Sequence, residues 1–345
     1  MKGLQRLLIV AYVVLGIIQT SVAGDFTAGN LFVVNQPSSG SAGDDFFLEF
    51  LPNGTKLNFL IPTSQEILGM RDVAFSAVTG TIFYTVSNWG SQTFEIREID
   101  SDGKPVQIYT DPDFGSGNIE LVFDSSGTLF IANNGFIFKK GPFSLSITQI
   151  FALPYTGIGD LEIDSQGNLY LSDPFLNSVV YKISPAGSIT TFADANDGLV
   201  NPYGLAMDAQ DHLYVANCTP SAPATIIKLD TEGNPTLFAR DISFQPNMLD
   251  LAFDSDGTLL ASCRETDTIL KFSPDGSWTT FADHEDGIND PASMALITYM
   301  PSCGGDFDKD GDVDGSDLAT FAAGGTGIGL EEFAADFGRT NCPLI

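Results

Sequence analysis

The sequence predicts an all-β fold, a six-bladed β-propeller, and three observations lead to this prediction. Strand-length apolar runs separated by turns containing Gly and Asp recur along most of the chain, a pattern typical of antiparallel meanders. The unit repeats at a period close to that of one four-stranded propeller blade. No segment of the repeating region keeps a 3.6-residue apolar period, which excludes strands that alternate with helices.

The repeating unit is clearest in residues 251–276. Here the turn Asp254-Ser-Asp-Gly257 joins two apolar runs, and a third run from Thr268 leads to the turn Pro274-Asp-Gly276. The second strand of each unit carries an aliphatic anchor, and successive anchors are 40 to 51 residues apart: Leu31, Ile82, Leu129, Leu169, Leu213 and Leu259. Six second strands therefore indicate six blades.

Only five first strands precede these second strands, so one is missing from the start of the chain. The sequence from Phe281 to Leu296 matches the sequence from Phe192 to Met207, which contains a first strand. We therefore expect the strand at 292–299 to complete the blade begun by residues 30–61. Such circular closure removes exposed sheet edges.

The N-terminus has the order of a secretory signal peptide. Two basic residues precede the apolar run Leu7–Ile18, and Ser21 and Ala23 are the small residues before a cleavage point after Ala23. The apolar run is short of a bilayer crossing. We predict a signal peptide over 1–23 and a secreted protein, extracellular or at the cell surface, with the periplasm as an alternative and no membrane span in the mature chain.

Charge and cysteine content narrow the partners and the covalent links. A net charge of −29 argues against nucleic-acid binding, and we expect a monomer. Four cysteines allow three pairings, and export permits disulfides. The favoured pairs are Cys303 with Cys342, which flank the C-terminal segment, and Cys218 with Cys263, which occupy nearly matching points of adjacent repeats.

Two stretches carry a family resemblance. Pro202-Tyr-Gly-Leu-Ala-Met-Asp208 with Leu213-Tyr-Val-Ala-Asn217, and the stretch from Ser172 to Gly187, resemble NHL repeats. That family and the related gluconolactonase-like family form six-bladed propellers, so the resemblance implies this fold for residues 24–301. It implies little about activity, since propellers host many functions.

The segment 302–345 has a different composition and carries a calcium-loop pattern. Carboxylates occupy relative positions 1, 3, 5, 7, 9 and 12, with Gly311 at position 6: Asp306, Asp308, Asp310, Asp312, Asp314 and Asp317. This spacing is that of an EF-hand loop and predicts one Ca²⁺ site. A disordered acidic tail is the alternative.

Asp317 in place of Glu, followed by Leu318, resembles the dockerin type I repeat. The resemblance implies a cohesin-like partner for the module 302–345. Dockerins have two such loops, however, and residues 329–338 keep only a helical stretch, which weakens the expectation of cohesin binding.

Matched acidic residues stand just before the first strands: Asp72, Glu120, Asp160 and Asp250. In a propeller these positions converge at one mouth of the channel, where they could hold a second divalent cation or a polar ligand. In the gluconolactonase-like family, an acidic residue at the start of a first strand binds the catalytic metal. The alternative is a set of structural carboxylates that bond turns or backbone.

Other polar residues point to structure rather than catalysis. Asn35, Asn133, Asp173 and Asn217 follow second strands and suit the turn into the third strand. The only histidines, His212 and His284, lie in separate loops, so histidine-dependent propeller chemistry loses support. We therefore assign no catalytic residue.

These observations favour a non-catalytic propeller that binds a protein or glycan, with the calcium module serving attachment or assembly. A divalent-metal-dependent hydrolase or lactonase of the gluconolactonase type is the second hypothesis. A structural spacer without a specific ligand is the third.

Overall fold

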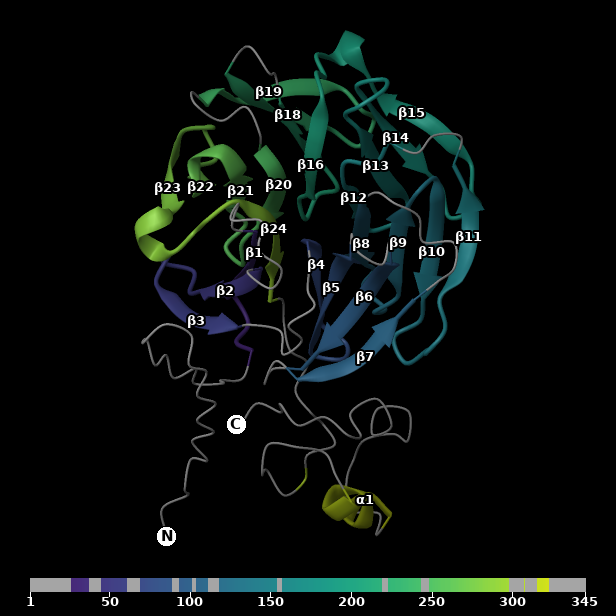
Figure 1. Cartoon of the computed structure of the whole chain (residues 1–345). Helices are drawn as coiled ribbons and strands as arrows, with labels where there is room; N and C mark the ends of the chain where they lie inside the picture. Colours follow the sequence, from purple (N-terminus) through teal and green to yellow (C-terminus); the bar gives the residue numbers. More distant parts are fainter. Residues whose placement is uncertain are drawn as a thin grey trace.

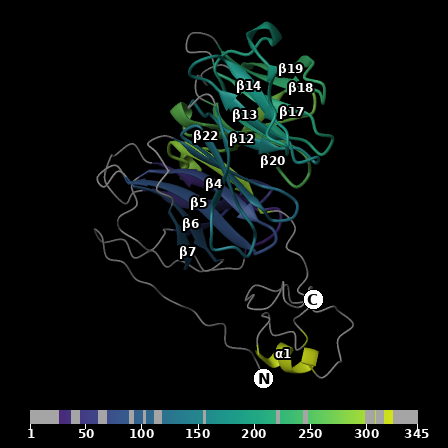
Figure 2. The ribbon, with the colours of Figure 1, turned by 90° about the vertical axis from the view of Figure 1, so that its right-hand side faces the viewer.

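Six four-stranded antiparallel sheets form a ring in the computed structural model (Figure 1). The structure describes residues 26–36, 45–60, 69–88, 93–100, 104–110, 118–153, 157–218, 223–242, 248–297, 307 and 315–322. Figure 2 views the same ring after a rotation of 90°, with β4–β7 below β12–β14. The predicted six-bladed β-propeller is confirmed.

The first strand of each blade contacts the first strands of both neighbouring blades, so these strands form the inner wall of the ring. They are β4 (Met70–Ser76), β8 (Ile119–Phe123), β12 (Leu161–Ile163), β16 (Pro202–Met207), β20 (Met248–Phe253) and β24 (Pro291–Leu296). The second strands are β5 (Thr81–Asn88), β9 (Leu129–Asn133), β13 (Leu169–Asp173), β17 (Leu213–Asn217), β21 (Leu259–Cys263) and β1 (Leu31–Asn35).

The third and fourth strands of each blade lie progressively further from the centre. The third strands are β6 (Thr93–Ile99), β10 (Phe136–Lys140), β14 (Val179–Ile183), β18 (Ala224–Leu229), β22 (Thr268–Phe272) and β2 (Phe46–Phe50). The outer strands are β7 (Pro105–Tyr109), β11 (Thr148–Ala152), β15 (Ile189–Ala193), β19 (Pro235–Ile242), β23 (Trp278–Ala282) and β3 (Lys56–Leu60).

The ring closes as the sequence predicts, because β24 pairs antiparallel with β1. Leu31 lies opposite Leu296, and Val33 lies opposite Met294. Two backbone hydrogen bonds extend the closure beyond the strands, from Gly29 N to Ile297 O and from Ile297 N to Asn30 O, each 2.8 Å. One sheet therefore joins chain segments more than 250 residues apart.

The core lies between neighbouring blades. All six predicted anchors are buried, with exposed fractions of 0–2%. Between the closing blade and the next one, Phe32, Phe47 and Tyr84 belong to one hydrophobic cluster. The rings of Phe47 and Tyr84 meet edge to face at 5.2 Å, a favoured aromatic geometry.

The polar residues predicted to follow the second strands are instead the last residues of those strands. They are structural, but most of them bond a different loop from the one predicted. Asn217 donates to Gly198 O and accepts from Val200 N, both at 2.7 Å. Asn35 similarly donates to Gly287 O at 2.8 Å. These side chains hold the loop that enters their own blade. Only Asp173 caps the following turn, accepting from Phe175 N and Leu176 N, as the sequence predicts.

The cysteine predictions have different outcomes. Cys218 and Cys263 are both buried in one hydrophobic cluster, and no disulfide joins these two thiols in the structure. The predicted 218–263 bond is therefore not formed here. Cys303 and Cys342 lie outside the described residues.

Two predicted end segments also fall largely outside the described part of the chain. Residues 1–23, the predicted signal peptide, are not among the described residues, and neither are Asp306, Asp308, Asp310, Asp312 and Asp314 of the predicted calcium loop. The helix α1 (Gly315–Ala322) begins near the end of that loop. Within the described ranges, no helix has the length and apolar character needed to cross a membrane.

Candidate functional site: the channel mouth

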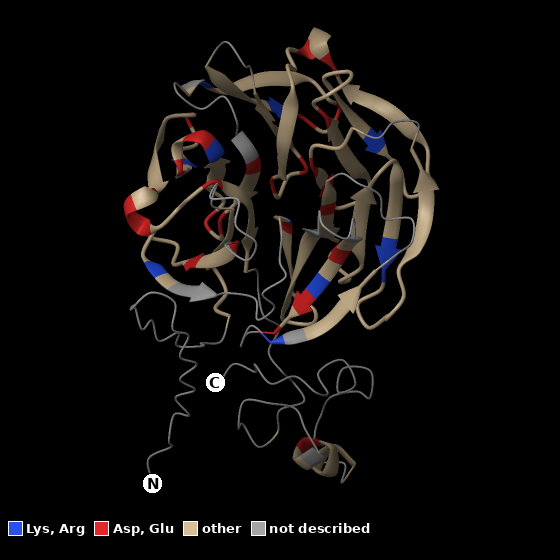
Figure 3. Cartoon of the chain, viewed as in Figure 1, with Lys and Arg blue, Asp and Glu red and all other residues tan. Residues whose placement is uncertain are grey.

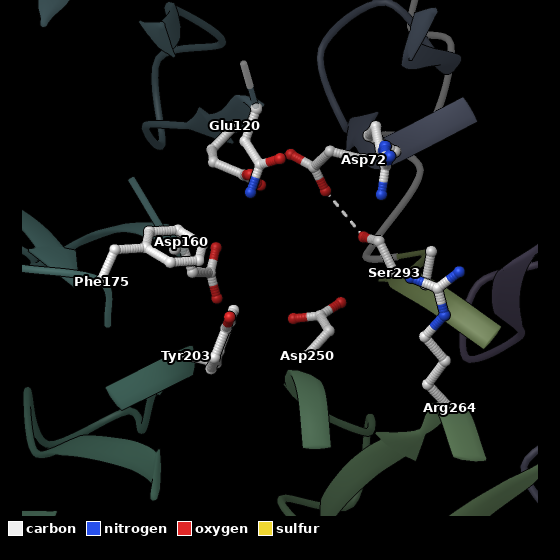
Figure 4. A pocket seen from close by; sticks show the side chains of 12 residues that line it. Asp72, Glu120, Asp160, Phe175, Tyr203, Asp250, Arg264 and Ser293 are labelled. Carbon is white, nitrogen blue, oxygen red and sulfur yellow. Dashed lines mark hydrogen bonds between the residues drawn. The ribbon is translucent and has the colours of Figure 1, made fainter. Parts of the chain in front are cut away.

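A pocket of about 190 Å³ opens where the inner strands begin. Figure 4 shows carboxyl groups from different blades pointing toward a common centre. The lining residues are Arg71, Asp72, Asn118, Glu120, Gly159, Asp160, Phe175, Tyr203, Asp250, Arg264, Ala292 and Ser293. The structure thus brings together all four predicted carboxylates, Asp72, Glu120, Asp160 and Asp250, at one mouth of the ring.

Three of these carboxylates bond the inner strand of the next blade. Asp72 accepts from Leu121 N, Asp160 accepts from Leu205 N, and Asp250 accepts from Met294 N, each at 2.6 Å. The partners are separated by 49, 45 and 44 residues, which is one blade. These short hydrogen bonds join blades in pairs, and they match the structural alternative for the carboxylates.

Different residues occupy the matched positions of the intervening blades. Gly204 lies so close to the next blade that a Cβ there would be 2.7 Å from the Cα of Asp250. A side chain at this position would therefore force the inner strands apart. Ser293 donates from Oγ to Asp72 Oδ1 at 2.7 Å, drawn as the dashed line in Figure 4. Glu120 is buried and has the Asn118 side chain as a hydrogen-bond partner.

Burial makes these carboxyl groups weaker acids than ordinary aspartate and glutamate side chains. It raises the pKa of Asp72 to about 6, against the opposing effect of hydrogen bonds from Ser293 and the backbone. The pKa values of Glu120, Asp160 and Asp250 are raised well above their usual range, first by burial and then by the charges of neighbouring carboxylates. Desolvation and like-charge repulsion both favour the protonated form.

One further carboxyl lies near the pocket without lining it. Glu162 is two residues beyond Asp160 on β12, so its side chain points to the same face of the strand. Burial raises the pKa of Glu162 to about 7, while a hydrogen bond from Ile163 N opposes the rise. A fifth carboxyl of raised pKa therefore lies near enough to Asp72 to be influenced by its charge.

Two arginines add positive charge to the pocket. Arg264 follows β21 and forms a two-point ion pair with Asp290, through Nε to Oδ1 and through Nη2 to Oδ2. Arg71 stands directly before Asp72 on β4 and is partly buried. Burial lowers the pKa of Arg71, and the nearby Arg264 lowers it further, whereas Glu120, Asp45 and Asp290 raise it.

An aromatic pair forms one side of the pocket. Phe175, from the turn after β13, packs edge to face against Tyr203 of β16 at 5.6 Å. Phe175 is 59% exposed, so an apolar ring face remains open beside the polar groups. Figure 4 shows both rings next to Asp160.

The metal predictions are not tested by this geometry. Among the described residues, no three His, Cys, Asp or Glu side chains are arranged to hold a metal ion. Asp317, the last residue of the predicted calcium loop, is buried and accepts from Phe307 N at 2.6 Å. Neither histidine lines the pocket, because His212 bonds Asp208 in an outer turn and His284 lies in a short 3₁₀ helix.

The pocket also contains groups that the sequence did not predict as site residues: Arg71, Asn118, Phe175, Tyr203 and Arg264. Arg71 stands one position before Asp72, just outside the matched residues of the first strands. Phe175 and Arg264 come from turns after second strands, where no repeat-wide pattern marks them. Their position depends on how the blades are arranged around the ring.

Comparisons with known proteins agree with the fold. No protein-family model matches the sequence, and no curated protein matches it. A chain in a crystal structure of a nidogen/laminin complex is similar over 78% of this chain and 98% of that chain, with 15% identity and a TM-score of 0.61.

Two further structures are similar in the same way. A streptogramin B lyase matches 77% of this chain and 91% of its own, with 15% identity and a TM-score of 0.53. A virginiamycin B lyase from Staphylococcus aureus, a catalytically inactive variant with alanine in place of a histidine, in complex with quinupristin, matches 75% and 86%, with 15% identity and a TM-score of 0.51. Identities this low support the propeller fold and nothing finer.

Proposed function

We propose that this protein is an exported propeller that binds a glycan or protein ligand at the channel mouth without transforming it. The observation that carries the proposal is the combination in one pocket of fixed carboxyl groups, arginines and an exposed aromatic ring. Binding sites use a few fixed polar groups beside apolar surface to orient a ligand.

The dimensions and chemistry of the pocket favour a sugar as the bound group. Drug-sized ligands occupy pockets of roughly 300–1,000 Å³, so a pocket of about 190 Å³ suits a single small ring or side chain. Asp250, Asn118 and Ser293 supply hydrogen-bonding groups for hydroxyls, and Phe175 supplies an apolar face. A protein ligand is the alternative to a sugar, and the similarity to a chain from a nidogen/laminin complex supports it.

A metal-dependent hydrolase of the gluconolactonase type is the second candidate, with Asp72, Glu120, Asp160 and Asp250 as its acidic residues. It is weaker because Asp72, Asp160 and Asp250 already accept hydrogen bonds from backbone N–H groups. A cation that drew these oxygens together would break contacts between blades. One of the similar lyases is inactive as a histidine variant, and this pocket has no histidine in its lining.

The C-terminal module is proposed as a calcium-stabilised element for attachment or assembly, with a cohesin-like protein as the expected partner. Its ligands would be Asp306, Asp308, Asp310, Asp312, Asp314 and Asp317. The hydrogen bond from Phe307 N to Asp317 supports this, because it joins the two ends of the predicted loop, as a ligand loop requires.

Ligand binding is tested with the full chain on a panel of immobilised glycans and extracellular-matrix proteins. We expect selective binding that the double variant Phe175→Ala with Tyr203→Ala reduces at least tenfold. Phe143→Ala is the matched control, because Phe143 is 63% exposed and does not line the pocket. Binding that is equal in both variants and the wild type would remove the channel mouth from the proposal.

Titration calorimetry separates the two metal hypotheses. We expect the wild type to bind one equivalent of Ca²⁺ and the variant Asp306→Ala with Asp310→Ala to bind none. Divalent metal that still binds this variant, and hydrolysis of a sugar lactone that depends on it, would favour the hydrolase. Unchanged calcium stoichiometry would reject the calcium loop.

A further inference from the structure

The pocket contains one cationic group whose hydrogen-bonding capacity is unused. Within the described part of the chain, no hydrogen bond or ion pair reaches the Arg71 guanidinium, although it lines the pocket. A guanidinium has five N–H donors and no acceptor. Partial burial makes unmet donors costly, so Arg71 favours a ligand that brings an acceptor.

The neighbouring groups do not supply that acceptor. Arg264 uses the carboxylate of Asp290 at two points. The carboxylate of Asp72 accepts from Val73 N, Leu121 N and Ser293 Oγ. Glu120 and Asp45 lie near enough to influence Arg71 electrostatically, but neither forms an ion pair with it.

Two of the carboxyl groups already accept hydrogen bonds from backbone N–H groups. Asp160 accepts from Leu161 N and Leu205 N, and Asp250 accepts from Met294 N. The donors without a partner are therefore those of the Arg71 guanidinium, and an oxyanion is the acceptor that suits them.

We propose that the channel mouth recognises an acidic sugar, whose oxyanion pairs with Arg71 and whose ring lies against Phe175 and Tyr203. This inference rests on the proposed ligand-binding function and names its ligand class. Guanidinium groups pair with planar carboxylates and with phosphate or sulfate through parallel N–H···O bonds. The hydroxyls of the same ring would meet Asn118, Ser293 and the carboxyl groups.

The test measures the binding of four sugars to the full chain by ligand-observed NMR and calorimetry: glucose, glucuronate, glucose 6-sulfate and glucose 6-phosphate. We expect at least one acidic sugar to bind about tenfold to 100-fold more tightly than glucose, the range for a charge-assisted hydrogen bond at a partly buried site. The three acidic sugars show which oxyanion the pocket accepts. The preference should decrease as salt is added.

Three variants assign the preference to Arg71. Arg71→Gln should remove the discrimination between acidic sugar and glucose while leaving the melting temperature close to that of the wild type. Arg71→Lys should keep part of it, because a lysine retains charge without the two-point geometry. Arg240→Gln is the control, since Arg240 is exposed on β19 and should leave all four affinities unchanged.

The outcomes separate this inference from the broader proposal. Equal affinity for glucose and all three acidic sugars, or a preference that survives Arg71→Gln, would overturn the acidic-sugar assignment and leave glycan binding intact. Failure of all four sugars to bind, with a matrix protein bound through Phe175 and Tyr203, would overturn the assignment and leave a protein ligand.

Discussion

Aspartates at the two ends of an inner strand have pKa values shifted in opposite directions. Asp160 stands just before β12 and Asp164 just after it. Burial and neighbouring carboxylates raise the pKa of Asp160. Burial would also raise that of Asp164, but hydrogen bonds from Asn168 and Tyr170 and the charge of Lys182 outweigh it, so its pKa is lowered.

The difference lies in the partners that each end provides. At the turn end, Asp164 accepts from Gln166 N and Asn168 N, and Lys182 lies 3.5 Å away. The same arrangement recurs in other blades, where Lys228 pairs with Asp208 and Lys271 pairs with Asp254. At the channel mouth, the charged neighbours of Glu120 and Asp160 are mainly other carboxyl groups. Figure 3 shows acidic residues at many points around the ring and few basic ones. Stability at the turn end thus depends on ionised carboxylates, whereas the mouth is most stable when its carboxyls are protonated.

The largest expected effect is a fall in wild-type stability between pH 5 and pH 8. A carboxyl whose pKa is raised in the folded state stabilises the fold below its ordinary pKa, and that contribution is lost as the pH rises through the folded value. For Asp72 and Glu162 these values are about 6 and about 7. Since each pKa unit corresponds to about 1.4 kcal/mol, we expect a loss of roughly 3 kcal/mol or more, measured by urea unfolding in EDTA. Stability that is constant or rises over this range would contradict the comparison.

Removing one of the hydrogen bonds between blades should have the next largest effect on the free energy of unfolding. Asp72→Ala leaves Leu121 N and Ser293 Oγ without their buried acceptor, which costs about 2–3 kcal/mol at pH 5, where the carboxyl is protonated. The loss of stability should be smaller at pH 8, because the variant also removes a carboxylate that burial destabilises in its ionised form. Asp256→Ala, in an exposed turn, is the control and should unfold like the wild type. A cost that grows with pH would show that Asp72 is stabilised as an anion.

Neutralising Glu162 should stabilise the protein at high pH. In Glu162→Gln the amide oxygen can still accept from Ile163 N, while the titrating charge is gone. We expect a gain of about 1–3 kcal/mol at pH 8 and little change at pH 5, from the same unfolding experiment. Glu232→Gln, on an exposed turn, should have no effect at either pH. A loss of stability at pH 8 would mean that the Glu162 anion has a stabilising partner.

The smallest effect is expected at the turn end, and its pH dependence should be reversed. Asp208 accepts from Gln210 N and His212 N and pairs with Lys228. Burial opposes ionisation, but these bonds outweigh it and lower the pKa of Asp208. Its contribution is therefore present above the ordinary pKa and lost as the pH falls through the lower folded value. Asp208→Ala should cost about 1 kcal/mol at pH 7 and less at pH 3, measured by thermal unfolding. A larger cost at pH 3 would refute the assignment.

Local pattern in the sequence was sufficient to predict the blades. Leu31 and the matched anchors mark the second strands because a buried strand needs an aliphatic residue at the same register in each unit. The match between 281–296 and 192–207 identified the closing strand. Asp254 and Gly257 were predicted as turn residues, and Asp254 Oδ1 accepts from Asp256 N and Thr258 N, with Gly257 at a φ of +75°.

The side-chain partners of the candidate site could not be predicted in this way. The bond from Leu205 N to Asp160 crosses from one blade to the next, and its geometry depends on how closely two inner strands approach. Gly204 allows such an approach to Asp250, but the sequence shows only a missing acid at that position. The unused donors of Arg71 are likewise a property of the assembled ring, since no local motif records which neighbours are already paired.

The pairing of β24 with β1 also has a consequence for biosynthesis. A nascent polypeptide that ends before Pro291 has the strands of five complete sheets, but its remaining blade lacks the inner strand and leaves one edge of β1 exposed. Unpaired edges promote association with other chains. We therefore expect the ring to form only after synthesis has passed Ile297, and shortened products to be sensitive to proteases and prone to aggregate.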